Sequence, residues 1–409
     1  MSMGHGRRRT KALIAGLVVA VTSSACAGPP RLGDRPLAGE RCSPPSGEHQ
    51  LSARPVDVAL DPAAVARAVA FASGNFSSSV RVYRHDCLVA TSATDPDLER
   101  VPANIYSATK TVLALVVGRA VTLGHLRLDD TVGTYFPEAD AAHARITVRD
   151  LLTQSSGLRF AWVNEVFPGP SNGVRYALSV PFAHEPGTYF EYSQVPLTLL
   201  AELVTRATGQ DVQTFADREV FSRIGIPRAR WTWNRDPSGL TYGYSELAMA
   251  PVDLAAVGSL MLHAGTWNGE RLIDDAYMAA MRNSSATNPG YGFLTWTNQG
   301  ETYFDQSLPV RPLVQRRIVR SAPADMFEAY GSNDQFIVAI PSVDLVVVRT
   351  GGAAPAGAAF LHEFLRLLLG GVEDRELVDP GPFVPDPAPP AATWDDLRKF
   401  FDPELPLGG

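Results

Sequence analysis

Residues 106–121 have the sequence YSATKTVLALVVGRAV, and this stretch decides the fold. Apolar side chains continue here for several helical turns, which predicts a buried helix that begins near Ser107. Positions i and i+3 share one face of a helix, so the prediction places Lys110 beside the Ser107 hydroxyl. The positive end of the helix and burial both favour a lowered pKa of Lys110, which suits a proton acceptor.

The lysine content supports this interpretation. The chain has 36 basic residues, of which only Lys11, Lys110 and Lys399 are lysines, so the central region contains one lysine. A structural cation could equally be arginine, but only lysine gives up its proton when buried. We therefore predict that Ser107 is a nucleophile and Lys110 its base. The alternative is a helix-capping serine followed by a solvated lysine.

A second candidate lies in residues 185–194, EPGTYFEYSQ. Pro186-Gly187 predicts a turn, and Tyr192 follows just before an apolar helix expected at residues 197–204. A tyrosine at such a junction can present its hydroxyl to a cleft. Near a lysine ammonium its pKa should fall, which would allow it to transfer protons. The alternative is an ordinary half-buried tyrosine.

One further serine motif is a poor candidate. Residues 169–173 match the esterase pattern G-x-S-x-G, with Ser171 at its centre. That pattern requires a preceding strand and a following helix. Phe167-Pro168 precedes it here, which indicates a loop, so Ser171 is not favoured as the nucleophile.

In their order along the chain, the motifs resemble the class C β-lactamase superfamily. This group includes D-Ala-D-Ala carboxypeptidases, family VIII esterases and 6-aminohexanoate-dimer hydrolases. The resemblance covers residues 56–373 and rests on Ser107-x-x-Lys110, Leu126-x-Leu128-Asp129-Asp130, the segment 146–158, Pro186-Gly187 and Tyr192-Ser193-Gln194. It implies that Ser107 is acylated, that Lys110 is its base or proton relay, and that Tyr192 is a second proton carrier. It also implies an oxyanion hole formed by the backbone N–H groups of Ser107 and Ser332.

Two positions depart from the pattern of that family. Gln194 stands where the family usually has asparagine, so an amide remains for hydrogen bonding to substrate. The family's Lys/His-Thr-Gly element is represented by Ala329-Tyr330-Gly331-Ser332, which lacks the cation. We expect Gln194, Tyr330 and Gly331 to border the substrate. The missing cation weakens the case for a β-lactam or a peptide carboxylate and favours the esterase and aminohexanoate-dimer branch.

The sequence therefore predicts a serine hydrolase that forms an acyl-enzyme with a small-molecule ester, amide or peptide-like substrate, without cofactor or metal. Two alternatives stay open: a β-lactamase or D-Ala-D-Ala carboxypeptidase, and a non-catalytic lipid-anchored binding protein of the same fold. A net charge of -7 and the lack of a basic stripe argue against nucleic acid as a partner.

The N-terminus predicts export. Basic residues 7–11 precede an apolar run at residues 12–21, and small residues lead to Cys26. Such a run is typical of a signal peptide and too short for a membrane span. We expect removal of residues 1–25, lipidation of Cys26 and anchoring at the outer face of the cytoplasmic membrane. Ser23 replaces the usual aliphatic residue of a lipoprotein signal, so plain export is the alternative, with a cytosolic protein as a further one.

An exported chain can form disulfides, and we expect one between Cys42 and Cys87, the alternative being two free thiols. Residues 26–55 are predicted to be a tether, residues 56–373 a hydrolase domain, and residues 374–409 a proline-rich tail with a short helix near 394–401.

Strands are expected at residues 80–83, 87–90, 335–340 and 344–349, while residues 107–294 are mainly helical. Because strands occur near both chain ends, we predict an α/β fold of the α+β kind. Its antiparallel sheet is built from both chain ends and flanked by helices, with a largely helical inserted subdomain.

Overall fold

The computed structural model describes residues 1, 38–47, 49–167 and 169–407. The predicted signal peptide and the lipidation site Cys26 lie outside these residues. Within the described ranges, no helix is long and apolar enough to cross a membrane. Leu37–Gly409 form one compact unit, which contains the sheet and the helices.

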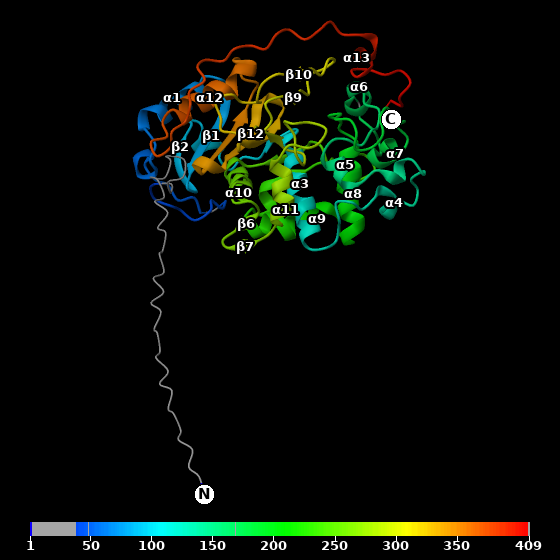
Figure 1. Ribbon diagram of the computed structural model, residues 1–409, viewed down its shortest axis with the longest axis horizontal. Coiled ribbons are helices and arrows are strands. Elements are labelled where there is room, and N and C mark those ends of the chain that lie inside the picture. The colour runs from blue at the N-terminus through cyan, green and yellow to red at the C-terminus, as the bar shows by residue number, and fades with distance from the viewer. Residues whose placement is uncertain (2–37, 48, 168, 408–409) are drawn as a thin grey trace. The chain divides into compact units, whose positions relative to one another are not determined.

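A six-stranded antiparallel sheet has the strand order β2-β1-β13-β12-β11-β8 (Figure 1). The first strand of the chain and the last strand of the sheet are neighbours within it, where Val82 of β1 lies opposite Val347 of β13. The predicted sheet built from both chain ends is therefore confirmed. The strands are β1 (Ser77–Arg84), β2 (Cys87–Thr91), β8 (Trp296–Thr297), β11 (Phe327–Gly331), β12 (Gln335–Ile340) and β13 (Leu345–Gly351).

The central strands are apolar because both faces of the sheet are covered. Along β13, Leu345 and Val347 pack into one hydrophobic cluster, whereas Val346 and Val348 pack into the other. Alternate side chains of a strand point to opposite faces, so a strand buried on both sides needs a nearly continuous apolar sequence.

Helices α1 (Pro62–Ser73) and α12 (Phe360–Leu369) pack on one face of the sheet, and α3 (Ala108–Thr122) and α10 (Pro251–Leu262) pack on the other. Helix α1 begins at Pro62 because the Asp61 carboxylate accepts hydrogen bonds from the backbone N–H groups of Ala63 (3.0 Å) and Ala64 (3.1 Å). The ring of Phe71 stacks on Phe360 at 5.8 Å between centroids, which joins α1 to α12.

The chain between β2 and β8 forms the expected helical insertion, which lies to one side of the sheet in Figure 1. Its further helices are α2 (Asp95–Leu98), α4 (Val132–Tyr135), α5 (Val148–Leu152), α6 (Trp162–Val166), α7 (Gly173–Ala177), α8 (Pro196–Thr208), α9 (Val212–Ala216) and α11 (Asp275–Arg282). Short strands accompany them: β3 (Ala103–Asn104), β4 (Trp231–Trp233), β5 (Leu247–Met249), β6 (Thr266–Trp267) and β7 (Glu270–Arg271), with β9 (Tyr303–Phe304) and β10 (Leu313–Val314) following β8.

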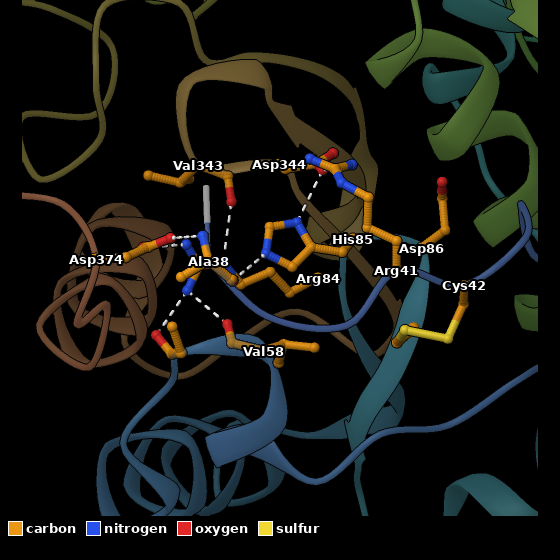
Figure 2. Close-up of polar contacts among 12 residues, drawn as sticks. Ala38, Arg41, Cys42, Val58, Arg84, His85, Asp86, Val343, Asp344 and Asp374 are labelled. Carbon is orange, nitrogen blue, oxygen red and sulfur yellow. Dashed lines mark hydrogen bonds and ion pairs between the residues drawn. A yellow bond between two sulfur atoms is a disulfide. The ribbon is translucent and has the colours of Figure 1, made fainter. Parts of the chain in front are cut away.

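The described part of the predicted tether, from residue 38 on, is fastened to the β1–β2 hairpin. Figure 2 shows the disulfide of Cys42, whose partner is Cys87. The Cys42 N–H donates to the His85 carbonyl at 2.9 Å, and Arg41 pairs with Asp344 at 2.7 Å. This segment therefore packs along the domain, because a covalent bond and backbone hydrogen bonds hold it there.

The proline-rich C-terminal segment also packs on the domain. It contains α13 (Trp394–Arg398), which lies near α6 in Figure 1. The Trp162 N–H donates to the Lys399 carbonyl at 2.9 Å, and the Trp162 ring stacks on Phe400. Leu405 is buried in the main hydrophobic cluster. The segment is held by a few apolar side chains and by backbone hydrogen bonds.

Candidate active site

Ser107 lies directly before α3, at the end of a tight loop. The loop is strained, because Tyr106 has a positive φ of 47° although it is not glycine. Asn104 stabilises this conformation, since its side-chain oxygen accepts a hydrogen bond from the Tyr106 N–H at 2.8 Å. The Ser107 side chain is thus presented at the positive end of α3, a helix whose side chains are almost all buried.

Lys110 lies one helical turn further along α3 and is 1% exposed. Its Nζ donates to Ser107 Oγ at 3.0 Å, to Gln194 Oε1 at 2.7 Å and to the Tyr244 carbonyl at 3.0 Å. Burial lowers the pKa of Lys110 to about 7, although the negative charge of Glu165 opposes the change. The direction agrees with the sequence prediction, because burial favours the neutral amine over the ammonium form.

Tyr192 is buried beside the same pair. The centroid of its ring lies 4.8 Å from Lys110 Nζ, and the ring stacks on Trp296 at 5.7 Å. Burial raises the pKa of Tyr192 above its usual value, and a hydrogen bond with Ser107 only partly offsets the rise. The expected fall in the Tyr192 pKa is therefore wrong, because removal of the phenol from water outweighs the nearby lysine.

The segment that contains Tyr192 is held by Gln154. The Gln154 side chain exchanges two hydrogen bonds with the Ser193 backbone, at 3.2 Å from its N–H and 3.0 Å to its carbonyl. The Gln154 carbonyl also accepts from the Glu191 N–H at 2.8 Å. The motif at residues 146–158 thus fixes the position of the tyrosine segment.

Two buried charged residues complete the surroundings. Glu165 of α6 accepts hydrogen bonds from the N–H groups of Gln194 (2.6 Å) and Val195 (3.1 Å). Burial raises the pKa of Glu165 to about 7 and lowers the pKa of Arg311 to about 9. Arg311 pairs with Glu191 and donates to the Tyr192 carbonyl at 2.8 Å. No local sequence pattern marks Glu165, Arg311 or Tyr244, so none of the three was predicted.

The end of β11 presses against the Ser107 loop. A Cβ at Gly331 would lie 2.1 Å from the Ile105 carbonyl oxygen and 3.0 Å from the Ala108 nitrogen, so only glycine fits there. This contact brings Ser332, the next residue, to the edge of the loop. The Tyr330 hydroxyl donates to Asp334 at 2.8 Å, so it is engaged within its own turn.

The structure thus brings together Ser107, Lys110, Tyr192 and Gln194, with Gly331 packed against them. Cys42 and Cys87 lie elsewhere, at the β2 edge of the sheet opposite β8. Across the described part of the chain, no group of three or more histidine, cysteine or acidic side chains is placed to hold a metal ion.

Gly331→Ala is expected to lower kcat about 10²-fold, because the added methyl group forces the Ser107 loop away from β11, and a displacement of about 1 Å can have that cost. Gly352→Ala is the matched control, since its Cβ would have its nearest neighbour at 3.7 Å. Esterase assays of both folded variants measure the effect. Equal activity of Gly331→Ala and wild type would contradict the close contact.

Comparison with known proteins identifies the family of the chain. The sequence profile of the family described as Beta-lactamase matches residues 79–350, which is more than half of the chain. The monacolin J acid methylbutanoyltransferase of Aspergillus terreus is 26% identical over 152 residues, which are 31% of this chain and 37% of that protein. The match therefore spans little more than a third of the transferase.

Two solved structures share the fold. A putative 6-aminohexanoate-dimer hydrolase from Bacillus anthracis aligns with a TM-score of 0.61 and 15% identity over 80% of this chain and 88% of its own. EstCE1, a hydrolase with promiscuous acyltransferase activity, aligns with a TM-score of 0.57 and 16% identity over 75% of this chain and 98% of its own. The profile match shows that the chain belongs to the β-lactamase family.

Proposed function

We propose that this protein is an exported serine hydrolase that cleaves an ester or amide bond through an acyl-enzyme on Ser107. The observation that carries the proposal is the hydrogen bond of 3.0 Å between Ser107 Oγ and a buried lysine amine whose pKa is lowered to about 7. A neutral amine at this distance is placed to accept the serine proton.

The two proton carriers have different roles in this mechanism. Neutral Lys110 takes the proton of Ser107 as Oγ attacks the substrate carbonyl carbon. Burial keeps Tyr192 protonated, so it donates its proton to the leaving group when the scissile bond breaks. The Lys110 ammonium then returns a proton to Tyr192. In the second step Lys110 accepts a proton from water, the water oxygen attacks the acyl carbon, and Ser107 leaves with that proton.

The oxyanion is assigned to the backbone N–H groups of Ser107 and Ser332. The contact of Gly331 with the Ser107 loop supports this assignment, because it places the end of β11 beside the nucleophile. Loss of one such donor typically reduces kcat about 10²–10³-fold. Gln194, Tyr330 and Gly331 are proposed to border the substrate.

The proposed substrate is a small ester or amide. Ala329 stands at the cation position of the Lys/His-Thr-Gly element, and the hydroxyl of the neighbouring Tyr330 is bound to Asp334, so an anionic β-lactam or peptide terminus lacks an evident partner there. Hydrolysis of an aryl ester measured against a chromogenic cephalosporin separates this substrate class from the β-lactamase alternative.

We also propose that the protein is exported and anchored to the membrane by lipid on Cys26. The disulfide between Cys42 and Cys87 supports export, because such bonds persist in oxidising compartments.

Incubation with a fluorophosphonate is expected to add one probe molecule to the wild-type protein and none to Ser107→Ala, as measured by intact mass. The reason is that only an activated serine attacks phosphorus at a useful rate. Ser171→Ala is the matched control, since it removes the serine of the G-x-S-x-G sequence, and it should label like wild type. Absence of labelling in folded wild type would favour the binding-protein alternative.

A further inference from the structure

We propose that Glu165 is a positioning residue for the reaction at Ser107. It fixes the turn that carries Gln194, and its buried carboxylate interacts electrostatically with Lys110. This inference rests on the proposed function, because the group that Glu165 positions is the proposed base.

Glu165 acts on the turn through hydrogen bonds. The first N–H groups of a helix lack partners within the helix, and a side-chain oxygen at the N-cap usually satisfies some of them. The residue before α8 is Val195, which has no such oxygen. Instead, Glu165 Oε2 accepts from Gln194 N–H at 2.6 Å and from Val195 N–H at 3.1 Å.

The same turn is connected to the base. Gln194 Oε1 accepts a hydrogen bond from Lys110 Nζ at 2.7 Å, so Glu165 is linked to Lys110 through one residue. A shift of the turn therefore displaces both the amide that orients Lys110 and the neighbouring Tyr192.

The charge of Glu165 is confined to the interior, where charges interact strongly. Glu165 is 2% exposed. Four titratable groups from the surrounding elements interact electrostatically with it: Lys110 of α3, Arg311 of the segment before β10, Tyr176 of α7, and Tyr244 before β5. An ionised Glu165 favours the ammonium form of Lys110, and thereby opposes the effect of burial on the Lys110 pKa.

Helix α6, which contains Glu165, is itself fixed by the C-terminal segment. The Val163 N–H donates to the Phe400 carbonyl at 2.9 Å, and the Asn164 side-chain amide donates to the Asp402 carbonyl at 3.0 Å. These contacts involve the two residues before Glu165 in the sequence and keep its carboxylate directed at the turn.

Two substitutions separate the effect of charge from that of geometry. Glu165→Gln keeps an oxygen that can accept from the turn but removes the charge. Glu165→Asp keeps the charge but withdraws it by one methylene group. Glu219→Gln is the matched control, because Glu219 is a buried carboxylate that pairs with Arg119, away from the turn.

The measurement is the second-order rate constant of fluorophosphonate labelling of Ser107 between pH 5 and pH 9, after thermal melting has verified the fold. Labelling needs neutral Lys110, so the rate rises with pH through the pKa of the Lys110–Glu165 pair. Removing the negative charge favours neutral Lys110, so in Glu165→Gln the rise is expected about one pH unit lower than in wild type. A role in capping alone leaves the position of the rise unchanged.

For Glu165→Asp, we expect a rise at the wild-type pH and a rate lower on the order of 10- to 10²-fold, because the turn is displaced. Glu219→Gln should match wild type both in the pH at which the labelling rate rises and in the rate itself. If the labelling rate of Glu165→Gln rises at the same pH as that of wild type, the inference is overturned. The proposed function is kept in that case, because wild type is still labelled. If Glu165→Gln does not fold, labelling of Glu165→Asp at the wild-type rate overturns the inference. If the wild-type protein is not labelled, both the inference about Glu165 and the proposed function are overturned.

Discussion

Lys110→Met is expected to lower kcat/KM for an aryl ester about 10³-fold, within the range that general base catalysis contributes. Methionine has a similar volume but cannot accept the Ser107 proton. The free energy of unfolding should change by only about 1 kcal/mol, because the cost of unpairing Gln194 and the Tyr244 carbonyl is offset by removal of a buried charge. Steady-state kinetics and urea unfolding measure the two quantities.

Lys399→Met is the matched control for this prediction. Lys399 belongs to the C-terminal segment and lies 3.4 Å from the Tyr189 hydroxyl, so the substitution removes a lysine without touching Ser107. Its kcat/KM should stay near that of wild type. A Lys110→Met enzyme that keeps at least a tenth of the wild-type rate would mean that another group activates Ser107.

Arg84→Met should lower the free energy of unfolding by about 3–5 kcal/mol, the usual effect of breaking a buried ion pair from one side. Arg84 is fully buried at the end of β1. Its guanidinium donates to the carbonyls of Val58 (2.7 Å), Ala59 (2.6 Å) and Val343 (3.1 Å), as Figure 2 shows in part, and it pairs with Asp374. The substitution leaves the carbonyls of Val58 and Val343 without the Arg84 donor, whereas Asp374 keeps the Ala38 N–H at 2.8 Å and the Ala59 carbonyl keeps the Glu373 N–H at 3.0 Å.

The measurement for Arg84 is the urea midpoint and slope followed by fluorescence. Arg175→Met is the matched control, since Arg175 is exposed on α7 and surface substitutions usually change stability by less than about 0.5 kcal/mol. A loss below about 1 kcal/mol for Arg84→Met would show that water replaces the lost hydrogen bonds.

The sequence predicted best those elements whose apolar residues recur at the spacing of a strand or a helix. The strand expected at residues 335–340 is β12, with the same bounds. Strands of two or three residues, such as β8, have too few side chains to show alternation. Their pairing is decided by the neighbouring strand, which is distant in sequence.

The residues of the candidate site also fall into those that the sequence could predict and those that it could not. Ser107 directly precedes α3 and Lys110 lies in its first turn, so their spacing alone placed them together. The position of Tyr192 before a helix made it a candidate, whereas Gln194 needed the resemblance to a family. Glu165 and Arg311 could not be found, because their partners come from other elements and depend on how α6 and the chain near β10 pack. The direction of the Tyr192 pKa was wrong for a related reason, since the burial of one tyrosine cannot be read from its neighbours in sequence.

The pairing of β1 with β13 also affects synthesis of the protein. Most of the chain separates these two paired strands, which are Ser77–Arg84 and Leu345–Gly351. At about 5–20 residues per second, β1 leaves the ribosome on the order of 10 to 50 s before its partner exists. During that time the chain cannot complete its sheet, so it stays open to chaperones and to any machinery that handles unfolded polypeptides.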